Sequence, residues 1–516
     1  PAPRLRDFIS QADQRRAVPA DPGGLKTLEQ VLDASSSSAS EGVSETSVKR
    51  LTVSNGWLIC DGRLLTGKAG GVAWWRGNIR PDEARSFGAG VTRFVPGRIG
   101  PGFTDDLDAL TETMIAGGQA ALDHNYGLWY DRRRDDHQRV RRMNGDVRPP
   151  FYEQPFARSG RGTAWDGLSK YDLTKYNPWY WSRLKEFADL CGRKGLVLLH
   201  QNYFQHHILE AGAHWADFPW RSANNINSTG FPEPPPYAGD KRIFMDELFY
   251  DVTHPVRRSL HRVYIRKCLD NFADDSNVIQ FTSAEYTGPL EFVRFWLDTI
   301  IEWKRETGKN PLIALSCTKD VQDAILADPV RRGAVSLIDI RYWWYQADGT
   351  LYAPESGQHL APRQHARLLY PGPTSFAQVH RAIREYQDKC PDKAVLYSAD
   401  DRFGWAVLMG GGAIPNIPGL TDEALLAAIP RMKPLDMSDE RADQYALAES
   451  GRNYLVYAAS GETIQVDLRQ TKGIFEVRVL DPKSGRLISS GDMVTAGAKV
   501  DLRPKVQPCV FWLTRQ

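Results

Sequence analysis

Short apolar runs with strand character alternate along most of the chain with longer segments of helical periodicity. The strand-like runs cover residues 91–95, 120–130, 195–200, 278–281, 311–316, 335–342 and 394–398. The helical segments lie at 105–117, 177–193, 254–272, 290–305, 319–332, 375–389 and 422–432. Strands that alternate with helices at this spacing predict a parallel sheet. Seven or eight such units over roughly 370 residues favour an α/β fold of the (β/α)8 barrel (TIM barrel) type with insertions. A doubly wound open sheet is the alternative, but no Gly-x-Gly-x-x-Gly follows an early strand.

The two ends of the chain follow other patterns. Residues 1–50 are polar, without a clear period, and predict an N-terminal arm. Residues 51–65 predict a hairpin with turns at Asn55-Gly56 and Asp61-Gly62, and this hairpin opens a barrel domain over 51–435. The short strands near the end, with turn residues between them, predict a C-terminal antiparallel β-sandwich over 436–516.

Composition narrows the classes of function. A chain of 516 residues with 42% hydrophobic and 25% charged residues is typical of a soluble globular protein with more than one domain. The net charge of +2 gives no argument for nucleic acid, and no apolar run reaches the ~18 residues of a membrane helix. The 15 Trp and 20 Tyr stand out, and many are adjacent. Core packing could absorb some of them, but clustered Trp and Tyr in polar loops favour flat amphipathic ligands such as sugars.

Cysteine usage and the first residue bear on the compartment. The six cysteines are scattered without metal-like spacing, and their oxidation state is left open. The chain starts at Pro1 rather than Met, so we expect that an N-terminal piece has been removed. If that piece is a signal peptide, the protein is secreted or periplasmic.

The apolar run 278–281 delivers a carboxylate, Glu285, to its carboxyl end, just before a chain break at Gly288-Pro289. Parallel α/β barrels keep their functional side chains at this end, although Glu285 could instead cap the helix that follows. Polar or charged residues, with one tryptophan, follow nearly every predicted strand: Arg98, His124, Asn125, Asp131, His200, Gln201, Asn202, Glu285, Arg341, Trp343, Asp400 and Asp401. Any one of them can be a structural hydrogen-bonding group, but together they predict a polar pocket.

Two carboxylates across a pocket are the minimal set for glycoside hydrolysis. Glu285 is the predicted acid, and Asp400 or Asp401 is its predicted partner after the strand 394–398. Strand alternation points only one of that pair inward, which favours Asp400 and leaves Asp401 to cap or to pair with Arg402. Asp339 is a third candidate, and a salt bridge to Arg341 is an equally good interpretation of it.

No cofactor or metal is predicted. His206-His207 would point to opposite faces of a strand, and no Asp, Glu or His spacing completes a metal site. Arg132-Arg133-Arg134 could bind an anionic sugar such as a uronate, and a solvated loop offset by Asp135 and Asp136 is the equal alternative.

The two ends of the chain resemble a known group of enzymes. Residues 54–65, followed by Gly70-Gly-Val-Ala-Trp74-Trp75, are similar to the opening hairpin and first strand of apiosidase-like (β/α)8 glycoside hydrolases. Residues 454–468 and Asp481-Pro482-Lys-Ser-Gly485 resemble the C-terminal collagen-binding-like β-sandwich of those enzymes. The resemblance implies catalytic carboxylates after the fourth and seventh strands, which are Glu285 and Asp400 or Asp401. The relatives usually have Asp where this chain reads Gly71-Val72-Ala73, and commonly Asp then Glu at the catalytic ends.

The predicted function is therefore a glycoside hydrolase that releases a terminal sugar from a plant or algal polysaccharide or oligosaccharide. Glu285 would protonate the leaving oxygen, and Asp400 or Asp401 would act as nucleophile or base. Predicted sugar-binding residues are Trp74, Trp75, Arg98, His124, Asn125, Asp131, His200, Asn202, Arg341 and Trp343. The alternatives are a polysaccharide lyase that acts on a uronate-containing glycan and a non-catalytic glycan-binding protein. The sugar, the stereochemical outcome and the oligomeric state stay open.

Overall fold

The computed structural model describes residues 48–71, 88–126, 151–209, 215–216, 218–235, 237–238, 242–243, 245–435, 443–460, 463–504 and 507–516. The predicted arm up to residue 47, Trp74, Trp75, Asp131 and the three consecutive arginines 132–134 lie outside these described residues.

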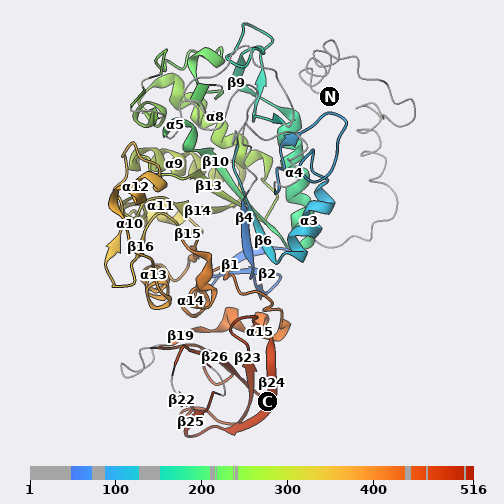
Figure 1. The fold of residues 1–516 in the computed structure, drawn as a ribbon, viewed down its shortest axis with the longest axis vertical. Helices are drawn as coiled ribbons and strands as arrows, with labels where there is room; N and C mark the ends of the chain where they lie inside the picture. The colour runs from blue at the N-terminus through green and yellow to red at the C-terminus, as the bar shows by residue number, and fades with distance from the viewer. Residues whose placement is uncertain are drawn as a thin grey trace, which may run out of the picture.

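Seven parallel strands form the main sheet, and they follow one another in space in the order of the chain (Figure 1). They are β4 (Lys68–Gly71), β6 (Gln119–His124), β10 (Val197–Phe204), β13 (Val278–Ala284), β14 (Leu312–Ser316), β15 (Leu337–Ile340) and β18 (Ala394–Tyr397). The sheet is curled, and the predicted α/β class with a parallel sheet is confirmed. Ala413 donates its backbone N–H to Val395 of β18, and Pro415 accepts one from Gly67 just before β4. Residues 413–415 therefore lie between the two outermost strands.

Helices connect these strands and follow the last of them. They are α3 (Leu107–Ala116), α4 (Pro178–Lys194), α8 (Pro255–Asn271), α9 (Leu290–Thr307), α10 (Lys319–Leu326), α11 (Pro329–Ala334), α12 (Pro362–Leu369), α13 (Phe376–Lys389), α14 (Gly404–Met409) and α15 (Glu423–Ala428). Helix α9 shows why they form: Phe292, Trp296, Ile300 and Trp303 recur at helical spacing and are all buried. Gly308, with φ 69°, ends that helix in the left-handed conformation that glycine adopts without strain.

Two sequence-based element assignments were wrong. The run 91–95 is a strand only at β5 (Arg93–Phe94), and β5 pairs antiparallel with β7 (Phe151–Tyr152) outside the main sheet. The segment 319–332 is two helices, because Pro329 begins α11 with Asp328 as its capping residue. The remaining short elements are β8 (Phe156–Arg158), β9 (Tyr171–Tyr176), α5 (His206–Leu209), β11 (Tyr237–Ala238), β12 (Arg242–Ile243), α7 (Asp246–Phe249), β16 (Trp344–Tyr345) and β17 (Leu351–Tyr352).

The hairpin predicted for residues 51–65 is confirmed and covers the amino ends of the parallel strands. Its strands are β1 (Leu51–Ser54), β2 (Trp57–Cys60) and β3 (Arg63–Leu64), and Asn55-Gly56 and Asp61-Gly62 all have positive φ. Leu51, Leu58 and Leu65 form one buried cluster with Val197, Leu337 and Ala394, each of which is the first residue of its strand. The apolar inner face of the sheet is thus closed at this end.

The C-terminal region is antiparallel, as predicted. Six strands form one sheet in the order β19 (Lys433–Leu435), β20 (Gln444–Glu449), β21 (Asn453–Ala458), β26 (Cys509–Arg515), β23 (Ile474–Leu480) and β24 (Leu487–Thr495). One face packs on the pair β22 (Ile464–Asp467) and β25 (Lys499–Leu502). The other face packs through Leu455 and Trp512 on Trp57 of the opening hairpin and on Trp405 and Leu425. The opening hairpin therefore lies between the parallel main sheet and this six-stranded sheet (Figure 1).

Two global properties bear on the predictions. Among the helices that the structure describes, none combines the length and hydropathy needed to cross a membrane. All six cysteines lie in the described residues, and each is a free thiol.

Candidate active site

The inner face of the parallel sheet changes from apolar to polar toward the carboxyl ends of the strands. Apolar inward residues such as Ala121, Leu199, Ala314 and Leu337 belong to the buried inner cluster. The inward positions two residues further along are Asp123, Gln201, Ser316 and Asp339. Gln201 donates to Oδ1 of Asp123 (3.0 Å), and Ser316 donates to Oδ2 of Asp339 (2.8 Å). A polar layer therefore lies above the apolar core, at the end where barrel enzymes keep their chemistry.

Arg341 ties this layer together across the sheet. Its Nε donates to Oδ2 of Asp339 (2.8 Å), and its Nη1 donates to Oδ2 of Asp123 (2.6 Å). Burial alone would lower the pKa of the guanidinium, but the charges of Asp339 and Asp123 outweigh burial and raise that pKa well above its usual value. Asp339 is completely buried. The salt-bridge interpretation of Asp339 therefore holds, and Asp123 is the partner of Arg341 that the sequence did not predict.

A cleft of about 460 Å³ opens at the carboxyl ends of β4 and β18. Its polar lining includes Asp123, Arg341, Ser398, Asp400 and Asp401. On the β4 side the wall is made by Gly70 and Gly71, so the backbone itself faces the cleft.

The two aspartates after β18 exchange their expected roles. Asp400, not Asp401, caps the short 3-10 helix Asp401–Phe403 and accepts hydrogen bonds from the backbone N–H and the guanidinium of Arg402. Hydrogen bonding to Arg402 lowers the pKa of the Asp400 carboxyl. Asp401 is exposed at the edge of the same cleft. The expectation that Asp401 pairs with Arg402 was wrong, because the turn after β18 brings the Asp400 carboxylate back onto Arg402.

Glu285 follows the fourth parallel strand, directly after the end of β13, and it is not among the residues that line the cleft. Its φ of 59° lies in the left-handed region, and its backbone N–H donates to the hydroxyl of Tyr342 (2.6 Å). Its Oε2 lies 3.6 Å from Nδ1 of the buried His206. Burial, with a further contribution from Glu285, raises the pKa of Tyr342. The helix-cap interpretation of Glu285 was wrong, because the capping residue of α9 is Pro289 and no side chain caps that helix.

Three predicted sugar-binding residues face away from the cleft. His124 and His200 lie side by side in register on the outer face of the sheet. Nε2 of His124 lies 3.2 Å from the hydroxyl of Tyr180, and Nδ1 of His200 lies 2.9 Å from Oε1 of Gln280. Asn202 accepts a hydrogen bond from Trp296 of α9 (2.8 Å). Burial lowers the pKa of His124 to about 3 and that of His200 to about 4. The prediction that these residues bind sugar was wrong because β10 runs on to Phe204. His200 and Asn202 therefore lie within the strand, at positions whose side chains point to the outer face of the sheet.

The other predicted binding residues are also elsewhere. Trp343 is fully buried on the outer side, where its Nε1 donates to Gln322 (2.7 Å). Arg98 is on an exposed loop with its guanidinium 3.8 Å from the centre of the Phe103 ring. Asn125 is half-buried just after β6 and does not line the cleft. Of the predicted binding residues that the structure describes, Arg341 alone lines the cleft.

Sequence reasoning missed Asp123, Tyr342 and His206 as site residues. The signal for Asp123 was present, since it lies two residues after the inward Ala121. His206 and His207 begin the short helix α5 instead of lying on a strand, so the reasoning from opposite strand faces was wrong. Within the described residues no group of three or more His, Cys, Asp or Glu could hold a metal ion.

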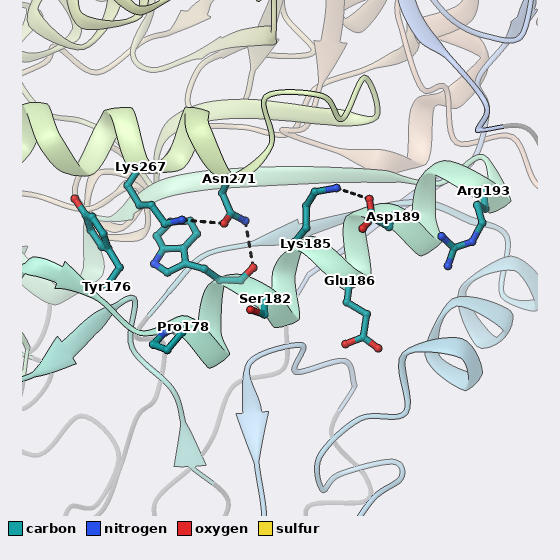
Figure 2. A pocket seen from close by; sticks show the side chains of 10 residues that line it. Tyr176, Pro178, Ser182, Lys185, Glu186, Asp189, Arg193, Lys267 and Asn271 are labelled. Carbon is teal, nitrogen blue, oxygen red and sulfur yellow. Dashed lines mark hydrogen bonds and ion pairs between the residues drawn. The ribbon is translucent and has the colours of Figure 1, made fainter. Parts of the chain in front are cut away.

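A second hollow, of about 680 Å³, lies on the outer side of α4 and α8 (Figure 2). Lys267 of α8 donates to Asn271 (3.1 Å) and lies 4.9 Å from the centre of the Trp181 ring. Lys185 and Asp189 of α4 form an ion pair farther along the same groove. None of the carboxylates of the cleft lines this groove.

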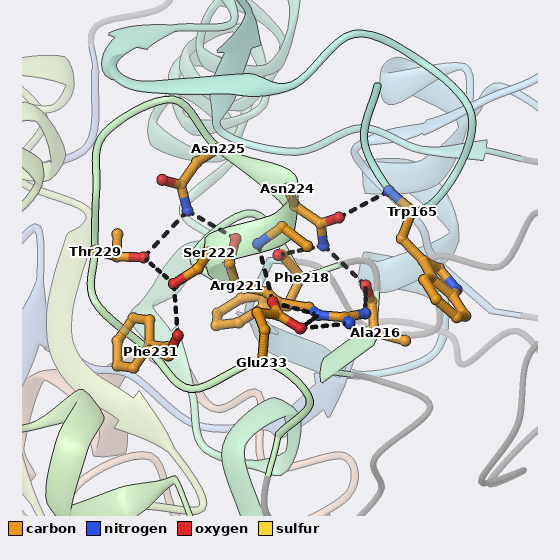
Figure 3. Close-up of polar contacts among 11 residues, drawn as sticks. Trp165, Ala216, Phe218, Arg221, Ser222, Asn224, Asn225, Thr229, Phe231 and Glu233 are labelled. Carbon is orange, nitrogen blue, oxygen red and sulfur yellow. Dashed lines mark hydrogen bonds and ion pairs between the residues drawn. The ribbon is translucent and has the colours of Figure 1, made fainter. Parts of the chain in front are cut away.

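The loop after β10 is fixed by its own polar network (Figure 3). Arg221 makes an ion pair with Glu233 (2.7 Å), and Asn224 donates to the backbone of Ala216 and Phe218. Asn224 also accepts the backbone N–H of Trp165 (2.9 Å), which joins this loop to the connection between β8 and β9. These loops follow the second and third strands, so they belong to the same end of the sheet as the polar layer.

Comparison with known proteins gives structural neighbours at low identity. No curated protein matches this sequence. One solved structure described as a glycoside hydrolase is 12% identical with a TM-score of 0.46, and the alignment covers 90% of this chain and 97% of that one. A glycoside hydrolase family 5 protein from Bacteroides vulgatus has the same identity and TM-score, with 90% and 94% covered. Endo-glycoceramidase II from Rhodococcus sp. is 11% identical with a TM-score of 0.34, with 90% and 99% covered. These low scores carry no argument about activity.

One protein-family model matches most of the chain. It is described as a domain of unknown function, DUF6298, and it matches residues 1–432. Because the match spans well over half of the 516 residues, the protein belongs to the DUF6298 family.

Proposed function

We propose that this protein is a glycoside hydrolase that releases a terminal sugar from a complex polysaccharide, and that it acts outside the cytoplasm. The observation that carries the proposal is the set of carboxylates at the carboxyl ends of sequentially ordered parallel strands. Asp123 lies near the carboxyl end of the second strand, Glu285 follows the fourth strand, and Asp400 and Asp401 follow the seventh. Asp123, Asp400 and Asp401 line one cleft. Carboxylates in this position are what glycoside hydrolysis needs.

A closed (β/α)8 barrel is part of the proposal. The hydrogen bonds of Ala413 to β18 and of Pro415 to Gly67 fill the position that an eighth strand would take. The strands already succeed one another in chain order, as they do in a barrel, whereas a doubly wound sheet reverses its order.

Glu285 is the proposed acid. Its carboxylate lies against the buried ring of His206, its backbone N–H is bound to Tyr342, and its side chain is 22% exposed, so it is held in a restricted and partly dehydrated place. Its strained backbone is the kind of feature that folded proteins retain at functional sites. Asp401 is the proposed nucleophile or base, because Asp400 is already engaged by Arg402 while Asp401 is exposed at the cleft edge.

The lyase alternative has less support among the described residues. A lyase needs a cation to neutralise the uronate and a basic side chain to remove a proton. Arg341 is already shared by two carboxylates, and burial raises the pKa of Tyr342, which makes its phenolate harder to form.

The test is a screen of plant and algal polysaccharides with the full chain. Released sugars are separated by chromatography, and unsaturated products are followed by their ultraviolet absorbance. The proposal expects a released monosaccharide without ultraviolet absorbance. An absorbing product would favour the lyase, and binding without any product would favour a non-catalytic glycan-binding protein.

A further inference from the structure

The charged groups of the cleft are unequal in number among the described residues. Three aspartates line it (Asp123, Asp400 and Asp401) against two arginines (Arg341 and Arg402). A fourth carboxylate, Asp339, lies directly behind Arg341 and shares its charge. A ligand that enters this cleft therefore meets an excess of negative charge from the described residues.

Neither arginine is free to offset that excess for an anionic ligand. Arg341 is held between two carboxylates at 2.6 and 2.8 Å. Arg402 is bound through two nitrogens to Asp400, and its side chain is 70% exposed, so it points largely to solvent. Arg402 and Asp400 together are close to neutral in their field, whereas Arg341 offsets only one of the two charges of Asp123 and Asp339. The carboxylates therefore set the sign.

Asp123 is the best placed of these carboxylates to meet a ligand. Its side chain is 18% exposed at the cleft, and both of its oxygens are fixed, Oδ1 by Gln201 and Oδ2 by Arg341. A carboxylate held from behind by two donors keeps its geometry when a ligand arrives, so it recognises that ligand at low entropic cost. Each oxygen has a further lone pair that can accept a hydroxyl or ammonium hydrogen of a sugar.

Among the described residues, the wall formed by β4 adds no charge. Gly70 and Gly71 of β4 face the cleft without side chains, and a Cβ added at Gly71 would meet nothing within 4 Å. The sign of the cleft therefore depends on the strands that carry Asp123 and the two aspartates after β18.

We infer that this cleft takes a neutral or amino-substituted sugar unit, rejects an acidic one, and owes this selectivity to Asp123. The inference rests on the proposed function, because it names the class of sugar that the hydrolase would accept. It concerns binding alone, however, so it can be tested without turnover.

Three small molecules built on one quaternary carbon separate charge from shape. They are protonated tris(hydroxymethyl)aminomethane, uncharged pentaerythritol and anionic 2,2-bis(hydroxymethyl)propionate. Their affinities for the full chain are measured by calorimetry at neutral pH and low salt. We expect the cation to bind about tenfold more tightly than the uncharged molecule, and the anion to show no binding.

Two variants and one control assign the effect to Asp123. Asp123→Asn should bring the cation down to the affinity of the uncharged molecule, while Asp492→Asn, an exposed position on β24, should change nothing. Gly71→Lys leaves the Arg341 ion pairs intact, and it should weaken the binding of the cation and allow the anion to bind. The inference is overturned if no probe binds, if all three bind equally, if the anion is preferred, or if folded Asp123→Asn keeps the preference. A preference for the anion would implicate the arginines 132–134 outside the described residues.

The two proposals fail separately. Hydrolysis that is confined to uronate glycans would overturn the inference and leave the hydrolase standing. Selective binding of the cation without hydrolysis of any glycan would do the reverse.

Discussion

Replacing Arg341 with methionine tests whether the carboxylate layer depends on one guanidinium. The change keeps an unbranched chain of similar length but removes the donors that now serve Asp339 and Asp123. Asp339 is fully buried, so its carboxylate would retain only the Ser316 hydroxyl as a donor among its present side-chain partners.

The expected loss of stability is large because a buried charge is left without its partner. Removing one member of a buried ion pair costs about 3–5 kcal/mol. Arg341 and Asp123 are 17% and 18% exposed, so the Asp123 side of the bridge recovers some hydration and the lower end of that range applies. The matched control is Arg402→Met, which also removes a guanidinium from a cleft aspartate. Arg402 is mostly exposed, so solvent already screens its ion pair and the loss should be small.

The assay is urea unfolding followed by tryptophan fluorescence, which the 15 tryptophans make sensitive. The double variant Arg341→Met with Asp339→Asn should recover part of the loss, because the amide carries no charge to be left buried. If Arg341→Met is no less stable than Arg402→Met, or if the second change recovers nothing, the account of the carboxylate layer is wrong.

Two further predictions concern single residues. Asp246 of α7 is buried, and burial, followed by the charge of Glu247, raises its pKa from 3.8 to about 8. The folded protein then holds a proton that the unfolded chain releases, so this group lowers stability as the pH rises from about 4 to about 8, by at most about 1.4 kcal/mol per pH unit. The stability of Asp246→Asn relative to the wild type should therefore increase as the pH rises across that window, as measured by urea unfolding at several pH values. A stability difference between the two proteins that does not change with pH would contradict this. At Glu285 the φ of 59° favours glycine, so Glu285→Gly should be about 1 kcal/mol more stable than Glu285→Ala; equal stabilities would argue against backbone strain there.

Much of the fold could be predicted because periodicity is local. The alternation of strands and helices gave the parallel sheet, and Asn55-Gly56 gave the opening hairpin, since each depends on neighbouring residues. The place of Glu285 after the fourth strand was also predicted, although the count included the run 91–95, which lies outside the main sheet, where the structure has β4.

The residues of the site were harder to predict than the fold. Which face of the sheet a side chain points to depends on where its strand starts and ends. The prediction ended the third strand at His200, whereas β10 runs to Phe204. This error placed two outward residues, His200 and Asn202, among the predicted sugar-binding residues and left out the inward Gln201, whose partner is Asp123. The bridge from Asp123 to Arg341 joins residues 218 positions apart, and no local pattern reports such a contact.

The central claim is that Glu285 carries the chemistry of a sugar-releasing site. The most direct measurement is the rate of sugar release by the wild type and by Glu285→Gln, on whichever polysaccharide the screen identifies. The account predicts at least about a 100-fold lower rate for the variant, with unchanged stability and unchanged binding of the quaternary-carbon probes. A folded Glu285→Gln protein that releases sugar at the wild-type rate would contradict it.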